Sequence, residues 1–202
     1  MNREYLIKMH AAKRTDIRKR LRDFSNTDGK KEIFNELLFC LLTPQSNAKK
    51  CWFAVEEISK LKKWNKKNIS SILSKNTRFH NNKTNYVLEA EYSWNDIKDK
   101  LNEEDITELR NFISENVKGY GLKEASHFLR NIGKSNNKIA ILDRHILRNL
   151  KDLEIIDNEK IKNGKHYLEI EKKFIDFSND INIPIDELDL LFWSEESGEI
   201  FK

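Results

Sequence analysis

Residues 117–148 hold three features whose chemistry could act together. They are a Gly-x-Gly turn at Gly119 and Gly121, a lysine at the mouth of a helix, Lys123, and an aspartate twenty residues further on, Asp143. Backbone N–H groups beside glycine bind phosphate, an amine can be a nucleophile, and a carboxylate can stabilise positive charge on a sugar. The segment therefore predicts a clamp for a DNA backbone with a lysine nucleophile and its electrostatic partner.

Lys123 falls in the first turn of a helix predicted over 122–132. The helix dipole disfavours a cation there by about 0.3–1 kcal/mol, so a lysine at this position invites a functional interpretation. The dipole, desolvation and nearby cations favour the neutral amine, which is the nucleophilic form. A surface lysine that extends into solvent is the alternative, and it is the commoner case for a lone lysine.

Asp143 directly precedes the apolar-periodic segment RHILRNL. This position predicts a helix N-cap that accepts N–H bonds from residues 145 and 146. A carboxylate held by a helix N-terminus stays ionised, and an ionised group near a sugar can stabilise a developing oxocarbenium ion. Capping and catalysis are compatible.

Gly119 and Gly121 both permit positive φ, which predicts a tight turn with unobstructed N–H groups between helices over 105–116 and 122–132. Lys118 adds a positive charge to that turn. The alternative is a helix C-cap followed by a turn that binds nothing.

The elements that must position these residues are helical throughout. Only two prolines and six glycines occur, so few positions can break a helix. No segment alternates as a half-buried strand does, and residues 139–142 are best explained as a buried connector. The sequence predicts an all-α protein with helices over 3–24, 31–43, 46–61, 66–74, 79–91, 105–116, 122–132, 143–151, 165–180 and 184–196.

Composition narrows the class of protein. The chain has 202 residues, enough for one domain or two small lobes, and its two cysteines are too few for a disulfide scaffold, a four-thiolate zinc site or an iron–sulfur cluster. No apolar run approaches the roughly 20 residues of a membrane span, and the N-terminus lacks the apolar region of a secretory signal. We therefore expect an intracellular, cytoplasmic protein.

The charge is unevenly distributed along the chain. Residues 47–83 carry ten Lys or Arg against two acids, and residues 117–151 carry eight against two. Residues 84–116 and 152–202 are acidic. Solvated helix faces are the common explanation of such runs. Two basic segments around an acidic one also fit a fold that gathers positive charge on one side to bind a polyanion.

The stretch VKGYGLK at 117–123, followed by LDRH at 142–145, resembles the helix-hairpin-helix DNA glycosylases. More narrowly, KEASHFLRNIG at 123–133, ILDRHIL at 141–147 and LDLLFWSEESGEIFK at the end of the chain are similar to the archaeal-type 8-oxoguanine DNA glycosylase/lyases. The similarity covers essentially the whole chain and includes LLFCLLT at 37–43 and RFHNNKTNYV at 78–87.

The resemblance implies an enzyme that flips 8-oxoguanine out of duplex DNA, excises the base and cuts the strand. Lys123 would attack C1′ and form a Schiff base, from which β-elimination would follow, and Asp143 would stabilise charge at the anomeric carbon. Lys118, Gly119 and Gly121 would bind the DNA backbone.

Base recognition is implied for the C-terminus. Trp193 would stack on the flipped purine, and Lys202 would reach back to contact it. Phe79 would enter the gap that the base leaves, with Arg78 beside it on the DNA. A core aromatic on the helix over 79–91 is an equally good explanation of Phe79.

The chain departs from the family pattern in two places. Thr43-Pro44-Gln45-Ser46 stands where relatives have Thr-Ala-Asn, and Ser194 stands where an aromatic is common. We expect these differences to affect which lesion is preferred, or how tightly it is bound, more than the reaction itself.

The resemblance implies a single two-lobed domain over 1–202, with one lobe formed by about 1–35 and 143–202 and the other, over 36–142, holding the hairpin at 105–132. The expected partner is double-stranded DNA containing 8-oxoguanine, bound by a monomer with no cofactor, metal or membrane. One alternative is a glycosylase for another oxidised base. Another is a non-catalytic helix-hairpin-helix module that binds DNA and needs neither Lys123 nor Asp143.

Overall fold

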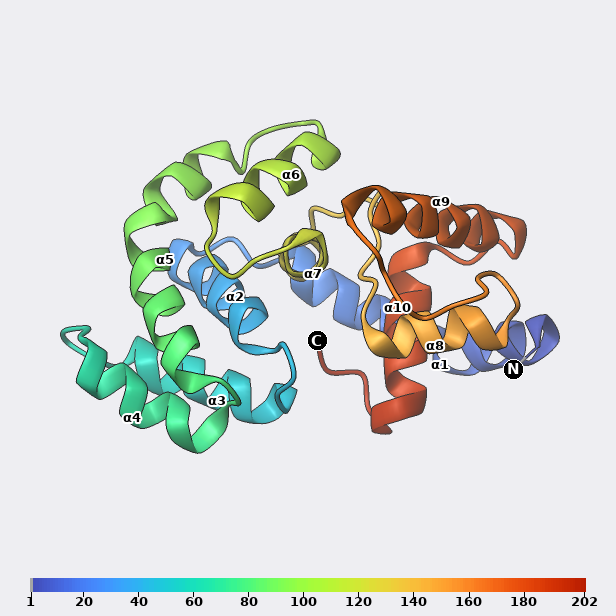
Figure 1. The fold of residues 1–202 in the computed structure, drawn as a ribbon. Helices are drawn as coiled ribbons and strands as arrows, with labels where there is room; N and C mark the ends of the chain where they lie inside the picture. Colours follow the sequence, from blue (N-terminus) through green and yellow to red (C-terminus); the bar gives the residue numbers. More distant parts are fainter. Residues whose placement is uncertain (1) are drawn as a thin grey trace. The chain divides into compact units, whose positions relative to one another are not determined.

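The computed structural model describes residues 2–202, which contain ten helices and no strand (Figure 1). The prediction of an all-α fold is confirmed. In order, the helices are α1 (Arg3–Ser25), α2 (Lys30–Leu42), α3 (Ala48–Ser59), α4 (Lys66–Asn76), α5 (His80–Lys100), α6 (Ile106–Asn116), α7 (Leu122–Asn131), α8 (Arg144–Asp152), α9 (Gly164–Asp180) and α10 (Ile185–Ser197).

One helix is much longer than the sequence predicts. The apolar pattern indicates an end near residue 91, whereas α5 continues to Lys100. Trp94 and Ile97 extend its apolar face by one further turn, because Ile97 is fully buried and the Trp94 ring lies 4.9 Å from that of Phe34 on α2. Phe34 also stacks on Trp64, with ring centroids 5.8 Å apart. These partners are distant in sequence, so local periodicity does not reveal the extension.

The chain forms two compact units. The terminal unit contains the residues up to Asn26 and Leu129–Lys202, and the middle unit contains Thr27–Phe128. The sequence predicts divisions at 35/36 and 142/143, and both observed divisions fall earlier in the chain. α2 belongs to the middle unit because it packs on α3 and α5. The connector 139–142 belongs to the terminal unit because it is hydrogen-bonded to α9.

That connector sets the position of Asp143. All four of its residues are buried and none is in a strand, as predicted. The Ala140 N–H donates to Glu171 Oε1 at 2.7 Å, and the Tyr167 hydroxyl donates to the Ala140 carbonyl at 2.7 Å. Side chains of α9 thus supply hydrogen-bond partners to a buried backbone segment that belongs to no helix or sheet.

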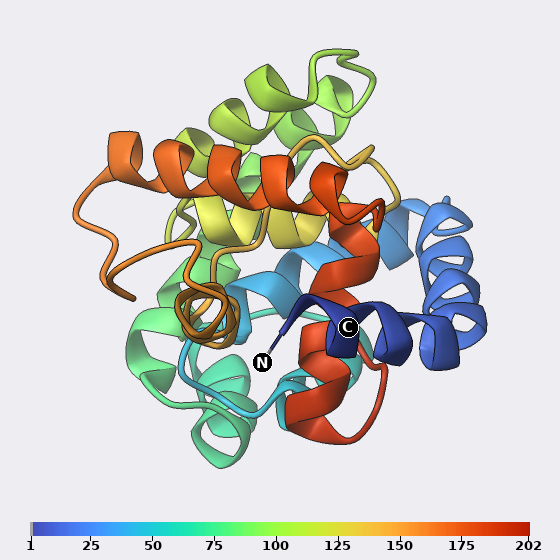
Figure 2. The same ribbon diagram turned by 90° about the vertical axis from the view of Figure 1, so that its right-hand side faces the viewer.

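In the terminal unit, α10 packs on α1, α8 and α9 (Figure 2). Phe192 stacks on Phe174 of α9 with centroids 6.1 Å apart. Glu187 ties α10 to α1, because its carboxylate accepts from Arg18 Nε at 2.9 Å and lies 2.6 Å from His10 Nε2. Glu187 is buried whereas the Arg18 side chain is half exposed, so these bonds satisfy a buried carboxylate and link the two helices.

Gly133 ends α7 in the terminal unit. Its φ is +68°, and a Cβ there would lie 2.5 Å from the Ser25 Cα. The Lys134 N–H donates back to the Leu129 carbonyl at 2.8 Å, which is the bond of a helix C-terminus closed by a left-handed residue. Only glycine combines this φ with so close a backbone neighbour.

We expect Gly133→Ala to lower the free energy of unfolding by about 2–4 kcal/mol, since it adds left-handed strain and overpacking. The matched control is Gly198→Ala at the end of α10, where φ is +77° and no atom lies within 4 Å of the added Cβ. That variant keeps only the strain and should lose about 1–2 kcal/mol. Denaturant unfolding of both variants measures the difference, and equal losses would contradict the role assigned to Ser25.

Candidate active site

The hairpin between α6 and α7 contains one left-handed glycine, not two. Gly119 has φ +92°, and a Cβ there would lie 2.5 Å from the Tyr86 ring of α5. Gly121 does not have positive φ, so the prediction for that residue is wrong. Gly119 makes the turn and lets it approach α5, whereas Gly121 is the last residue before α7.

Lys118 stands on the outer side of this turn. Its amine lies 3.1 Å from Glu89 Oε1, and both side chains are exposed. An exposed ion pair contributes only about 0–1 kcal/mol, so a phosphate can replace the carboxylate at little cost.

Lys123 is the second residue of α7, and its side chain is 21% exposed. Its amine lies 3.6 Å from Glu124 Oε1. The other carboxylate oxygen, Glu124 Oε2, accepts from the Gly121 N–H at 3.2 Å. Glu124 therefore caps the helix start and supplies a negative charge beside Lys123.

Glu124 is a site residue that the sequence reasoning missed. A glutamate three residues after the residue that precedes a helix is the second half of a capping box, and this signal was present in the sequence. Its contact with Lys123 could not be inferred in the same way, because adjacent residues on a helix do not face each other by default.

Asp143 is the N-cap of α8, as predicted. Its Oδ1 accepts from the His145 N–H at 2.8 Å and from the Ile146 N–H at 2.9 Å. Both bonds end on the same oxygen, and Oδ2 takes no part in the cap. The helix N-terminus thus holds the carboxylate in a fixed orientation.

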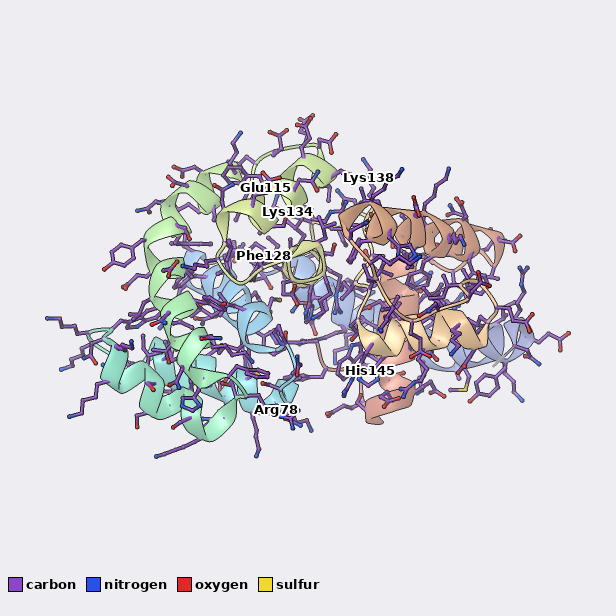
Figure 3. The ribbon with its side chains drawn as sticks, viewed as in Figure 1. Arg78, Glu115, Phe128, Lys134, Lys138 and His145 are labelled. Carbon is purple, nitrogen blue, oxygen red and sulfur yellow. The ribbon has the colours of Figure 1, made fainter. Side chains whose placement is uncertain are left out.

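His145, at the start of α8 (Figure 3), links Asp143 to Trp193 within the terminal unit. Its backbone bonds the Asp143 carboxylate, and its imidazole lies 5.3 Å from the Trp193 ring, centroid to centroid. Arg148 lies 3.1 Å from His145 Nδ1 and pairs with Glu196 at 2.6 Å. The His145 and Trp193 rings are tilted by 55°, so His145 contacts the indole without stacking on it.

Lys202, the last residue, is only 8% exposed, so the tail is docked and not frayed. Arg20 donates from Nε to the carbonyl of the preceding residue, Phe201. The C-terminus of the chain is therefore held on the terminal unit, which is a condition for Lys202 to have a defined role.

Arg78 and Phe79 lie in the turn between α4 and α5 of the middle unit (Arg78 in Figure 3). Phe79 has φ +56° and ψ +35°, and its side chain is 58% exposed. This exposure excludes the alternative that Phe79 is a core aromatic. An exposed phenylalanine in a left-handed conformation is uncommon and calls for a functional explanation.

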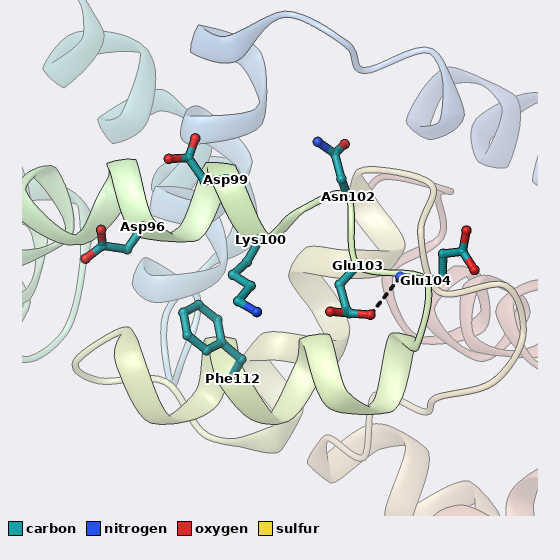
Figure 4. Close-up of a pocket in the computed structure, with 7 residues that line it drawn as sticks. All are labelled: Asp96, Asp99, Lys100, Asn102, Glu103, Glu104 and Phe112. Carbon is teal, nitrogen blue, oxygen red and sulfur yellow. Dashed lines mark hydrogen bonds between the residues drawn. The ribbon is translucent and has the colours of Figure 1, made fainter.

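An open pocket of about 630 Å³ lies where α5 turns into α6 (Figure 4). None of the predicted site residues lines it, and four carboxylates would repel a phosphate there. The lining residues are Asp96, Asp99, Lys100, Asn102, Glu103, Glu104 and Phe112.

None of the helices within residues 2–202 combines the length and apolar character that crossing a membrane requires. Nor do three or more His, Cys, Asp or Glu side chains in that range gather into a group that could hold a metal ion.

Comparison with known proteins gives consistent matches over the length of the chain. The family described as 8-oxoguanine DNA glycosylase matches residues 17–183. A Fusobacterium nucleatum subsp. nucleatum protein named 8-oxoguanine DNA glycosylase/AP lyase is 44% identical over 208 aligned positions, which cover 96% of this chain and 95% of that protein.

Solved structures agree. The 8-oxoguanine DNA glycosylase of Thermotoga maritima superposes with a TM-score of 0.90 at 26% identity, covering 99% of this chain and 98% of that one. The Methanocaldococcus jannaschii 8-oxoguanine glycosylase/lyase, in complex with 15mer DNA containing 8-oxoguanine, gives a TM-score of 0.88 at 31% identity, covering 98% of this chain and 100% of that one. The chain therefore belongs to the helix-hairpin-helix family of 8-oxoguanine DNA glycosylases, the family that its hairpin, Lys123 and Asp143 segments resemble.

Proposed function

We propose that this chain binds double-stranded DNA containing 8-oxoguanine as a monomer in the cytoplasm, excises the oxidised base and cleaves the strand, with Lys123 as the nucleophile. The observation that carries the proposal is the lysine in the first turn of α7, directly after the hairpin, in a chain 44% identical to a protein named 8-oxoguanine DNA glycosylase/AP lyase.

In this reaction the lone pair of the Lys123 amine forms a bond to C1′, and the bond from C1′ to the base breaks. The base leaves with a proton, and opening of the sugar gives a Schiff base between Lys123 and C1′. Loss of a proton from C2′ then expels the 3′ phosphate by β-elimination. The first step uses the lone pair of the neutral amine, and the position of Lys123 in the first turn of α7 places that amine directly after the hairpin.

Asp143 has the electrostatic role. Cleavage of the glycosidic bond develops positive charge on the sugar, and a fixed carboxylate stabilises that charge without reorganising. The two N–H bonds to Oδ1 fix the carboxylate before substrate arrives, which supports this assignment.

The hairpin would bind a phosphate of the strand. The Gly121 N–H already holds an anionic oxygen, Glu124 Oε2, at 3.2 Å, so this N–H is oriented toward negative charge. Lys118 would add an ionic contact from the exposed side of the turn. Gly119 provides the turn that presents both groups.

Base recognition would fall to Trp193 and Lys202. The indole of Trp193, which the His145 ring contacts at a tilt of 55°, can stack on a flipped purine. The docked terminal lysine supplies an ammonium that can hydrogen-bond an oxidised guanine edge. Phe79 would fill the gap in the duplex, with Arg78 next to it on the backbone.

Lys123→Gln should abolish covalent trapping of the protein on an 8-oxoguanine duplex by borohydride and slow base excision by at least about 10³-fold, because no nucleophile remains. Binding should be retained. The matched control is Lys118→Gln, which removes the same charge from the same hairpin. It should keep the adduct while lowering the salt dependence of binding by about one unit of slope. An adduct with Lys123→Gln would overturn the assignment, and no adduct with the wild type would favour a binding module.

Asp143→Asn separates charge from capping. Asn caps a helix as well as Asp, so we expect the stability of this variant to stay within about 0.5 kcal/mol of the wild type, whereas Asp143→Ala should lose about 1 kcal/mol. Both variants lose the charge and should excise the base about 10²–10³-fold more slowly. Thermal unfolding and single-turnover excision give the two quantities. If Asp143→Asn excised at the wild-type rate, Asp143 would be a cap only.

A further inference from the structure

A buried lysine follows the exposed Phe79 by four residues. Lys83, one turn into α5, is 4% exposed. Its Nζ donates to the Leu42 carbonyl at 2.7 Å, to the Pro44 carbonyl at 2.9 Å and to Ser46 Oγ at 2.9 Å. A lysine ammonium has three N–H donors, and these three acceptors use all of them. The amine therefore fixes the loop between α2 and α3.

Ser46 passes this restraint on to the turn that carries Phe79. Its hydroxyl oxygen accepts from Lys83 Nζ and also from the Arg78 N–H at 2.9 Å. The hydroxyl itself is directed to the Pro44 carbonyl at 3.4 Å. A hydroxyl has two acceptor positions and one donor, and in Ser46 all three are occupied. Ser46 therefore joins the loop between α2 and α3 to the turn between α4 and α5.

Phe79 is restrained mainly through its backbone. The residue is 58% exposed, so packing restrains it little, and its left-handed φ is unfavourable for a residue other than glycine. Ser46 bonds the backbone on one side, at Arg78, and the Lys83 N–H bonds the Phe79 carbonyl at 3.1 Å on the other. The second bond is the first backbone bond of α5, which any residue at position 83 would make, so the Lys83 side chain acts on Phe79 through Ser46 alone.

We propose that Lys83 and Ser46 are positioning residues that hold Phe79 ready to enter the duplex when the damaged base leaves the stack. This inference rests on the proposed function, in which Phe79 is the wedge. Burial of the amine lowers the pKa of Lys83 from its usual value, and the nearby Cys51 opposes this in part. The geometry carries the inference: the Lys83 amine bonds three oxygens of the loop after α2, and one of these, Ser46 Oγ, bonds the backbone next to Phe79.

The test compares excision with nicking in single turnover. Excision of 8-oxoguanine from a duplex requires the wedge, because the damaged base must leave its pair. A duplex that already contains an abasic site can be nicked without this step. Ser46→Ala removes the junction and leaves the two carbonyl contacts of Lys83 in place. We expect it to slow excision about 3–10-fold and to change nicking less than about twofold. Ser74→Ala, an exposed serine of α4 that bonds only its own helix, is the matched control and should change neither rate.

A double-mutant cycle identifies the route of the effect. If Ser46 acts through Phe79, then Ser46→Ala with Phe79→Ala should excise no more than about twofold more slowly than Phe79→Ala alone. A 2-aminopurine next to the lesion should report slower unstacking in Ser46→Ala and not in Ser74→Ala. Multiplicative losses, wild-type excision by Ser46→Ala, or an equal loss of nicking would each overturn the proposal.

Lys83→Met removes the amine and leaves the Leu42 and Pro44 carbonyls without their donor, so it is assayed at a temperature at which circular dichroism shows it folded. It should show the same selective loss of excision, while Lys98→Met on the same helix, whose amine bonds Asn95, should not. If Phe79→Ala itself excised at the wild-type rate, this inference would fall together with the wedge. Borohydride trapping through Lys123 would still decide the proposed reaction independently.

Discussion

The N–H groups that a helix leaves unpaired at its N-terminus are the constraint on which this site depends. Three of the residues proposed to act on DNA stand at such ends: Lys123 at α7, Asp143 at α8 and Phe79 at α5. An all-α chain with short connections has few other places where a side chain can be both fixed and accessible. The three ends treat their N–H groups differently: Glu124 bonds the Gly121 N–H before α7, Asp143 caps α8, and α5 has no side-chain cap.

The start of α7 shows how a cation is tolerated where the dipole disfavours it. Glu124 places one oxygen on the Gly121 N–H and the other near the Lys123 amine, so a single carboxylate offsets both the dipole and the lysine charge. At α8 the carboxylate is itself the cap. The proposed nucleophile and its proposed electrostatic partner thus both stand at helix N-termini, one beside a capping carboxylate and the other as the capping carboxylate.

The sequence predicts those parts of the structure that depend on neighbours in the chain. Helix periodicity, the cap at Asp143, the turn at Gly119 and the buried connector at 139–142 are all local, and the structure confirms them. The extension of α5 was not predicted because it depends on Phe34, which is about sixty residues away from Trp94 in the sequence. The positive φ expected at Gly121 was wrong because one left-handed glycine already completes the turn.

Lys83 shows why charge patterns along a sequence give only part of a binding surface. It is one of the ten basic residues of 47–83 that favoured a polyanion interface. Its amine, however, is buried and donates hydrogen bonds to uncharged oxygens. Nothing in the local sequence distinguishes it from its exposed neighbours, because its partners come from the loop after α2. Placing Phe79 in solvent removes the packing that usually fixes an aromatic ring, so hydrogen bonds to the backbone must fix it instead. Those bonds need a buried polar junction, and a lysine with three donors is well suited to form one beneath an exposed turn.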